Sequence, residues 1–278
     1  MAGEASEGDP EGKEGARYIT AMVQTAEQLE AKGVRGMEAR RETPFVVFAD
    51  GGEQSLDRGA STVRWAVDHL EADFFAKRPT TIFPVFLFKD ADSYYRGVEK
   101  LTGDEPSTPY GFYSRTHGGL FMNIATGGGT LVHEIVHPYV EADFPNAPAW
   151  LNEGLGSLFE QSAERDGHIV GLTNWRLAGL QKAIKEDRVP TFKTLTHLGD
   201  NEFYGDDSGL NYAAARYLLY YLQEKGVLRD FYRAFRSAAA DDPSGYQTLV
   251  STLAVIGERD MAAFEATWKK QVAALAFP

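Results

Sequence analysis

The residues of this sequence best suited to chemistry lie at positions 130–137, which read TLVHEIVH. His133 and His137 are four residues apart, so on an α-helix both imidazoles project from one face and can bind the same metal ion. Glu134 would project beside this pair, where its carboxylate can exchange a proton with a water molecule near the metal. The pattern H-E-x-x-H therefore predicts metal-assisted hydrolysis.

Two nitrogen ligands make a weak metal site, so a third ligand is needed. The chain has no cysteine, which leaves His, Asp or Glu as possible ligands. Glu153 lies in the apolar segment AWLNEGLG, 16 positions after His137. A second helix joined by a short loop could bring its carboxylate to the histidine pair.

The two motifs HEIVH and WLNEG together resemble those of the gluzincin metallopeptidases, the thermolysin-like group in the broad sense. The resemblance covers residues 120–160 and implies Zn²⁺ held by His133, His137 and Glu153. It also implies that bound peptide runs antiparallel to the strand before the metal helix, by strand addition. Here that substrate-binding edge would consist of Leu120, Phe121, Met122, Asn123, Ile124 and Ala125.

Three positions depart from related patterns. Ser157 stands where thermolysin has an acidic residue that supports a histidine ligand, so Glu160 or Asp143 would have to take that role. Pro138 directly follows His137 and should kink or end the helix. Asp143 occupies the third-ligand position of the metzincins, but that pattern needs glycine where this chain has Val140. We therefore favour Glu153 as ligand and expect Asp143 in a loop or supporting a ligand.

Attack on a carbonyl group develops negative charge that needs a hydrogen-bond donor opposite the metal. On family likeness, Tyr212 is the first choice for this donor, ahead of Tyr204 and His197. Tyr212 is equally explained as a core residue of the segment YAAARYLLYYL. The remaining histidines, His69, His117 and His168, are expected on the surface or in loops.

The elements that must position these residues follow from apolar patterns. Residues 1–16 are polar and acidic and are expected to form a disordered tail. Next, the patterns predict a helix from Tyr18 to Gly33, a strand at 44–49, a helix at 61–74 capped by Ser61, a strand at 81–88, a helix at 91–101 and a hairpin at 111–125. After the metal helix they predict helices at 150–159, 175–184, 212–222, 228–235 and 261–275.

The predicted fold class is therefore α+β and zincin-like. An N-terminal mixed-sheet lobe at residues 17–144 would carry the zinc helix, and an all-α lobe at 145–278 would supply the third zinc ligand. The glycines at 127–129 would form the turn into the metal helix rather than an anion site, because no G-K-[ST] lysine follows them.

Composition limits the partners. The formal net charge of −12 disfavours nucleic acid, and no run approaches the roughly 18 apolar residues of a membrane span. The polar, acidic start does not read as a secretory signal, and an exported protein without its signal and a cytoplasmic protein both fit. The oligomeric state is open.

The expected function is a zinc metallopeptidase that acts on peptide or protein substrates, with Glu134 as general base. The alternative is a catalytically silent, zinc-bearing peptide-binding or scaffolding domain. Glu134 argues against that alternative, since a silent relative could lose the base without losing the metal.

Overall fold

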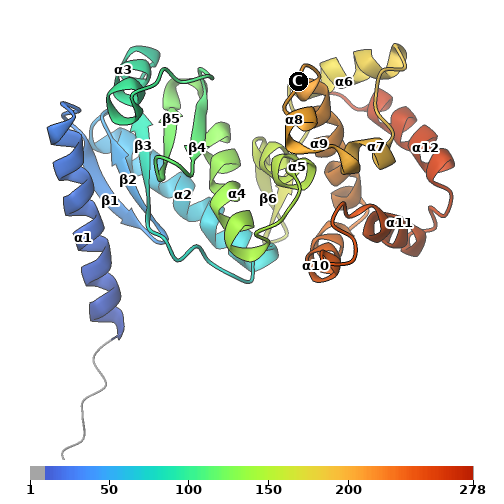
Figure 1. Ribbon diagram of the computed structural model, residues 1–278, viewed down its shortest axis with the longest axis horizontal. Coiled ribbons are helices and arrows are strands. Elements are labelled where there is room, and N and C mark those ends of the chain that lie inside the picture. The colour runs from blue at the N-terminus through green and yellow to red at the C-terminus, as the bar shows by residue number, and fades with distance from the viewer. Residues whose placement is uncertain (1–9, 278) are drawn as a thin grey trace, which may run out of the picture. The chain divides into compact units, whose positions relative to one another are not determined.

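The computed structural model describes residues 10–277 and has a mixed α+β fold (Figure 1). The chain folds as two compact units. Unit 1 comprises the residues up to Arg64 and residues 80–130, and unit 2 comprises residues 65–79 and those from Leu131 onward. The predicted division near residue 145 thus falls inside unit 2, and most of the HEIVH helix groups with the C-terminal part of the chain.

The elements of unit 1 build a five-stranded mixed sheet in the order β1-β2-β3-β5-β4. The pairs β2–β3 and β3–β5 are parallel, whereas β1–β2 and β4–β5 are antiparallel. The elements are α1 (Pro10–Ala31), β1 (Glu38–Glu42), β2 (Phe45–Ala49), the first half of α2 (Glu53–Asp73), β3 (Phe83–Phe88), α3 (Ala91–Thr102), β4 (Gly111–Ser114), β5 (Gly119–Asn123) and the 3₁₀ turn η1 (Ile124–Thr126).

Helices cover both faces of this sheet. On one face, Tyr18 of α1 and Tyr94 of α3 pack in a core with Phe86 and other alternate strand residues. On the other face α2 approaches the sheet so closely that a Cβ on Gly59 would lie 2.0 Å from a methyl carbon of Leu87. Alternation of side chains along each strand supplies both faces with apolar groups.

Two predicted boundaries in unit 1 are corrected. Helix α1 begins at Pro10, so residues 10–16 are not a disordered tail, while residues 1–9 lie outside the described part of the chain. Helix α2 begins at Glu53, so Ser61 lies inside it and is not its N-cap. The loop at 50–52 supplies the helix start instead, because Gly52 adopts a positive φ of 76° and its carbonyl accepts the first helical hydrogen bonds.

The predicted substrate-binding edge is also corrected. Strand β5 is not at an edge, because its Leu120 pairs with β3 on one side and with β4 on the other. Its backbone hydrogen bonds are therefore used within the sheet and are not open to an added strand. Ile124 and Ala125 do not belong to the strand but lie in η1.

Unit 2 is mainly helical but not all-α, since β6 and β7 form an antiparallel hairpin. Asp166 and Gly167 both have positive φ, 55° and 79°, as a two-residue type I′ turn requires. The elements are the end of α2, α4 (Gly129–Asp143), which enters the unit at Leu131, α5 (Ala149–Phe159), β6 (Ser162–Arg165), β7 (His168–Gly171), α6 (Arg176–Lys185), α7 (Phe192–His197), α8 (Asp200–Phe203), α9 (Ser208–Glu224), α10 (Leu228–Ala238), α11 (Tyr246–Val255) and α12 (Met261–Ala274).

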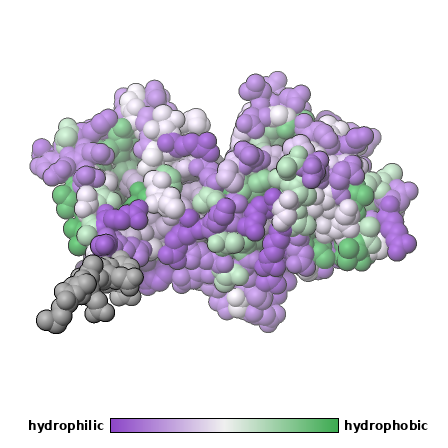
Figure 2. Space-filling view, turned by 60° about the horizontal axis from the view of Figure 1, so that its bottom comes forward, coloured by the Kyte–Doolittle hydropathy of each residue, from purple (hydrophilic) through white to green (hydrophobic). Residues whose placement is uncertain are grey.

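The face drawn in Figure 2 is largely hydrophilic, and apolar side chains gather there only in small separate patches. This agrees with the acidic composition of the chain. Among the described residues, no helix has the length and apolar character needed to span a bilayer.

Candidate metal centre

Helix α4 carries the H-E-x-x-H motif and is buried on nearly all sides, including His133, Glu134 and His137. The helix enters after Gly127, whose φ of 109° suits glycine. Pro138 does not end the helix, which continues to Asp143. A proline inside a helix removes one backbone hydrogen bond, and burial of the following turn, with Tyr139 fully buried, offsets that loss.

Helix α5 packs closely on its neighbours because two positions lack side chains. A Cβ on Gly154 would approach Leu219 of α9 to 2.9 Å. A Cβ on Gly156 would lie 3.0 Å from Nε2 and Cδ2 of His133. The two glycines of the segment NEGLG therefore allow α5 to pack against α9 and against His133 of α4 without a steric clash.

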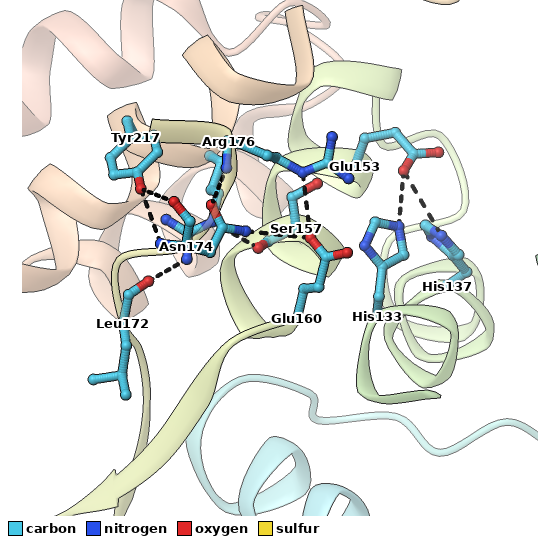
Figure 3. A network of polar contacts seen from close by, with 10 residues as sticks. His133, His137, Glu153, Ser157, Glu160, Leu172, Asn174, Arg176 and Tyr217 are labelled. Atoms are coloured by element: carbon cyan, nitrogen blue, oxygen red, sulfur yellow. Dashed lines mark hydrogen bonds and ion pairs between the residues drawn. The ribbon is translucent and has the colours of Figure 1, made fainter. Parts of the chain in front are cut away.

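The three predicted ligands converge in the interior of unit 2 (Figure 3). One ligand atom from each of His133, His137 and Glu153 lies within 4.8 Å of the other two, and each residue is only about 7% exposed. Oε2 of Glu153 is 3.2 Å from Nε2 of His133 and 3.8 Å from Nε2 of His137. Across the described residues, no other group of His, Asp and Glu side chains meets this criterion.

These distances fit a shared metal ion. Ligand atoms about 2.0–2.1 Å from one tetrahedral ion lie about 3.3 Å apart, which is close to the two contacts of Glu153. Two histidines and a carboxylate buried together are costly without a common partner, and a cation supplies one. The buried His-His-Glu group can therefore hold a metal ion.

Asn152 orients the second histidine, and the sequence analysis did not identify it. Its Oδ1 lies 3.0 Å from Nδ1 of His137. An amide oxygen can only accept, so Nδ1 is the donor in this contact and Nε2 is the nitrogen that faces the other ligands. The signal was available, because Asn152 directly precedes the ligand Glu153 in the motif.

We expect Asn152→Ala to lower metal affinity about 10- to 100-fold while the protein stays folded, since this is the usual effect of removing an outer hydrogen-bond partner from a metal-ligating histidine. Competition titration against a chelating dye measures the affinity, and Asn201→Ala, at an exposed position of α8, serves as the matched control. Unchanged affinity in Asn152→Ala would contradict the orienting role.

Glu134 lies beside the three ligands rather than among them. Its Oε2 is 3.6 Å from Nε2 of His137, and its side chain is also buried. A carboxylate next to the position of a metal, but not needed as a ligand, can accept a proton from water there.

The buried charges shift the proton affinities of two ligands in opposite directions. Burial alone would lower the pKa of His133, but its hydrogen bond to Glu153 and the charge of Glu134 raise that pKa to about 9. Burial alone would raise the pKa of Glu153, but the charge of His137 and the contacts to His133 and Tyr204 lower it to about 2. At neutral pH, without metal, His133 is thus a positively charged imidazolium and Glu153 is an ionised carboxylate.

Metal uptake near pH 7 should therefore release about one proton, because a histidine must be neutral to bind a metal ion. The apparent affinity for the metal should rise as the pH approaches 9, because His133 loses its extra proton near that pH and the proton then no longer competes with the metal. Calorimetric titration in buffers of different ionisation enthalpy measures the released proton. An enthalpy that does not depend on the buffer would show that no proton is displaced.

Two tyrosines approach the Glu153 carboxylate. The hydroxyl of Tyr204 donates to Oε1 of Glu153 at 2.8 Å. The ring of Tyr212 stacks on that of His133, with centroids 6.5 Å apart and planes within 14°. Burial, followed by the charge of Glu153, raises the pKa of both hydroxyls above the usual range, so both remain protonated donors at neutral pH.

The other histidines lie away from this group. His197 contacts the backbone oxygen of Lys193 at 2.7 Å, the hydroxyl of Thr196 and the ring of Tyr246, and not Glu153 or a ligand histidine. His168 contacts Asp73 at 2.6 Å, and Nδ1 of His69 lies 2.8 Å from a backbone oxygen of its own helix. His117 is exposed in the turn between β4 and β5.

No protein-family model matches this chain, and no curated protein matches it in sequence. What can be said of the site therefore depends on its own geometry. That geometry includes a clear difference between the two candidate third ligands.

Asp143, the alternative third ligand, is fully engaged elsewhere. It ends α4, and its carboxylate accepts hydrogen bonds from Arg236 at 2.5 and 2.6 Å, from the hydroxyl of Tyr232 at 2.9 Å and from the backbone of Lys77 at 3.1 Å. Asp143 thus lies neither in a loop nor against a ligand histidine, and its role is an ion pair that joins α4 to α10.

Glu160, the other residue expected to support a ligand histidine in place of Ser157, contacts Asn174 and Arg176 instead of a ligand histidine. It lies one residue past the end of α5, and its negative charge helps to raise the pKa of His133. Its Oε2 accepts from Asn174 at 3.3 Å and from Nε of Arg176 at 3.2 Å. Figure 3 shows these contacts of Glu160 at the start of α6, beside the separate contacts of Glu153 with the two histidines.

Proposed function

We propose that this chain is a zinc-dependent peptidase of the gluzincin type, with a zincin-like arrangement of the metal helix. The single observation that carries the proposal is the convergence of His133, His137 and Glu153 within 4.8 Å, with the Glu134 carboxylate beside them. Two nitrogens and one carboxylate oxygen, with no thiolate available in the chain, form a donor set that suits zinc.

In the proposed reaction, His133, His137 and Glu153 would hold Zn²⁺, which would supply Lewis acidity and make a nearby water molecule more acidic. Glu134 takes a proton from that water as it attacks the carbonyl carbon of the peptide, and then gives the proton to the leaving amine nitrogen. The hydroxyl of Tyr212, the donor favoured by sequence, or that of Tyr204 would donate to the carbonyl oxygen as its negative charge develops. No covalent enzyme intermediate is needed.

The peptidase proposal is tested by incubating the zinc-loaded protein with a peptide library and identifying the cleaved bonds by mass spectrometry. We expect cleavage that stops on chelation and returns with added zinc. Stoichiometric zinc without cleavage of any peptide would instead favour the silent zinc-bearing domain.

A further inference from the structure

Arg176 lies at the start of α6, and Figure 3 shows its side chain extending toward His133 and Glu153. Its Nε donates to Glu160 at 3.2 Å. Its backbone N–H donates to the side chain of Asn174 at 3.1 Å, which fixes the first turn of α6. The guanidinium group is thus held in place at one nitrogen.

Two aromatic rings flank the same guanidinium. Its carbon lies 4.3 Å from the ring centre of Trp175 and 5.2 Å from that of Tyr212. Tyr212 in turn stacks on His133, so one aromatic ring separates Arg176 from a metal ligand. Such rings hold a guanidinium plane in place and leave its edge available for hydrogen bonds.

The edge of the Arg176 guanidinium carries hydrogen-bond donors that are not used within the described residues. Within residues 10–277, the terminal nitrogens of Arg176 donate to no described acceptor, and neither is among the buried side-chain atoms that lack a partner. These nitrogens therefore reach solvent, although the side chain as a whole is only 14% exposed. A guanidinium edge of this kind matches a carboxylate through two parallel hydrogen bonds.

The local charge also favours an incoming anion. Arg216 is fully buried, its charge interacts with that of Arg176, and its Nη1 has no partner among the described residues. Burial and, to a smaller extent, the charge of Arg176 lower the pKa of Arg216 to about 10, which still leaves it charged at neutral pH. Glu160 forms an ion pair with Arg176, and its charge also acts on Arg216.

We propose that Arg176 is a specificity-determining residue that binds a carboxylate of the peptide substrate next to the metal centre. The carboxylate is either an Asp or Glu side chain near the cleaved bond or the free C-terminus of the peptide. This inference rests on the proposed peptidase function. A structural role in the ion pair with Glu160 would use only Nε of Arg176. Binding of a substrate carboxylate would also use the two terminal nitrogens, which otherwise have no acceptor among the described residues.

The test measures peptide binding to the zinc-loaded Glu134→Gln variant, so that cleavage does not interfere. Fluorescence anisotropy compares peptides identical except for Glu against Gln, and a free C-terminus against an amide. We expect one carboxylate source to bind about 10- to 100-fold more tightly than its neutral counterpart. Adding Arg176→Gln should remove this preference. Arg176→Lys should retain part of it, because lysine keeps the positive charge but lacks the paired N–H groups of a guanidinium.

The matched control is Arg188→Gln, in an exposed pair with Glu186 near the end of α6, which should leave the preference unchanged. Zinc content and thermal melting verify that each variant is folded. If Arg176→Gln does not fold, the test uses Arg176→Lys instead. A preference for the carboxylate peptide that is as large in Arg176→Lys as in the parent protein then overturns the proposal. Equal binding of all four peptides, or a preference that survives Arg176→Gln, overturns it as well. Failure of the peptidase proposal appears separately, as intact peptides with the wild-type protein.

Discussion

Glu134→Gln should abolish peptide cleavage while the protein keeps its zinc. The substitution replaces a carboxylate by an amide of the same shape, and an amide cannot accept a proton from water. General acid–base catalysis contributes about 10²- to 10⁴-fold, so we expect a fall in kcat of at least about 100-fold. KM should change little, because Glu134 acts in the transition state rather than in substrate binding.

Two measurements on Glu134→Gln separate this role from a structural one. Elemental analysis should find about one zinc per chain in both proteins, because Glu134 lies 3.6 Å from His137 without being one of the three ligands. The control is Glu141→Gln, at a partly buried position of the same helix, which should retain activity. Equal cleavage by wild type and Glu134→Gln would show that another group moves the proton.

Glu153→Ala should lower zinc affinity by more than about 100-fold, beyond the range expected for an outer partner such as Asn152. It removes the only carboxylate in the three-ligand group and leaves two imidazoles. Asp143→Ala should instead leave zinc affinity nearly unchanged and lower thermal stability, because it breaks the buried pair with Arg236.

Chelator competition and thermal melting of the metal-free proteins distinguish these two variants. In Glu153→Ala the affinity falls most, and in Asp143→Ala the melting temperature of the metal-free protein falls most. The reverse order of affinities would favour Asp143 as third ligand, although its carboxylate is engaged by Arg236, Tyr232 and Lys77.

The convergence of His133, His137 and Glu153 could be predicted because the spacing rules behind it are local. A four-residue separation places His133 and His137 on one helical face in any protein. Glu153 could be predicted because its motif is short and the connection to the second helix is brief. Tyr204 was named only as a donor ranked behind Tyr212, and its hydrogen bond to Glu153 was not predicted. Arg176 was not named at all. Both positions depend on long-range packing, which no local period encodes.

Several elements were missed for different physical reasons. Strand β1 has the sequence EARRE, and its partly exposed polar residues lack the apolar alternation that indicates a strand. The β6–β7 hairpin did carry a signal, because Asp-Gly at 166–167 is typical of a two-residue turn, but its flanking strands are short. The position of β5 within the sheet could not be read from its own residues, since the apolar run LFM suits an edge or a central strand equally.

X-ray absorption spectroscopy of the zinc-loaded protein, on wild type and Glu153→Gln, tests the central claim most directly. We predict a single zinc with two imidazole nitrogens and a carboxylate oxygen at about 2.0–2.2 Å in the wild type, and loss of that oxygen in the variant. An identical spectrum in both proteins, or a wild-type zinc without two imidazole ligands, would contradict a metal held jointly by His133, His137 and Glu153.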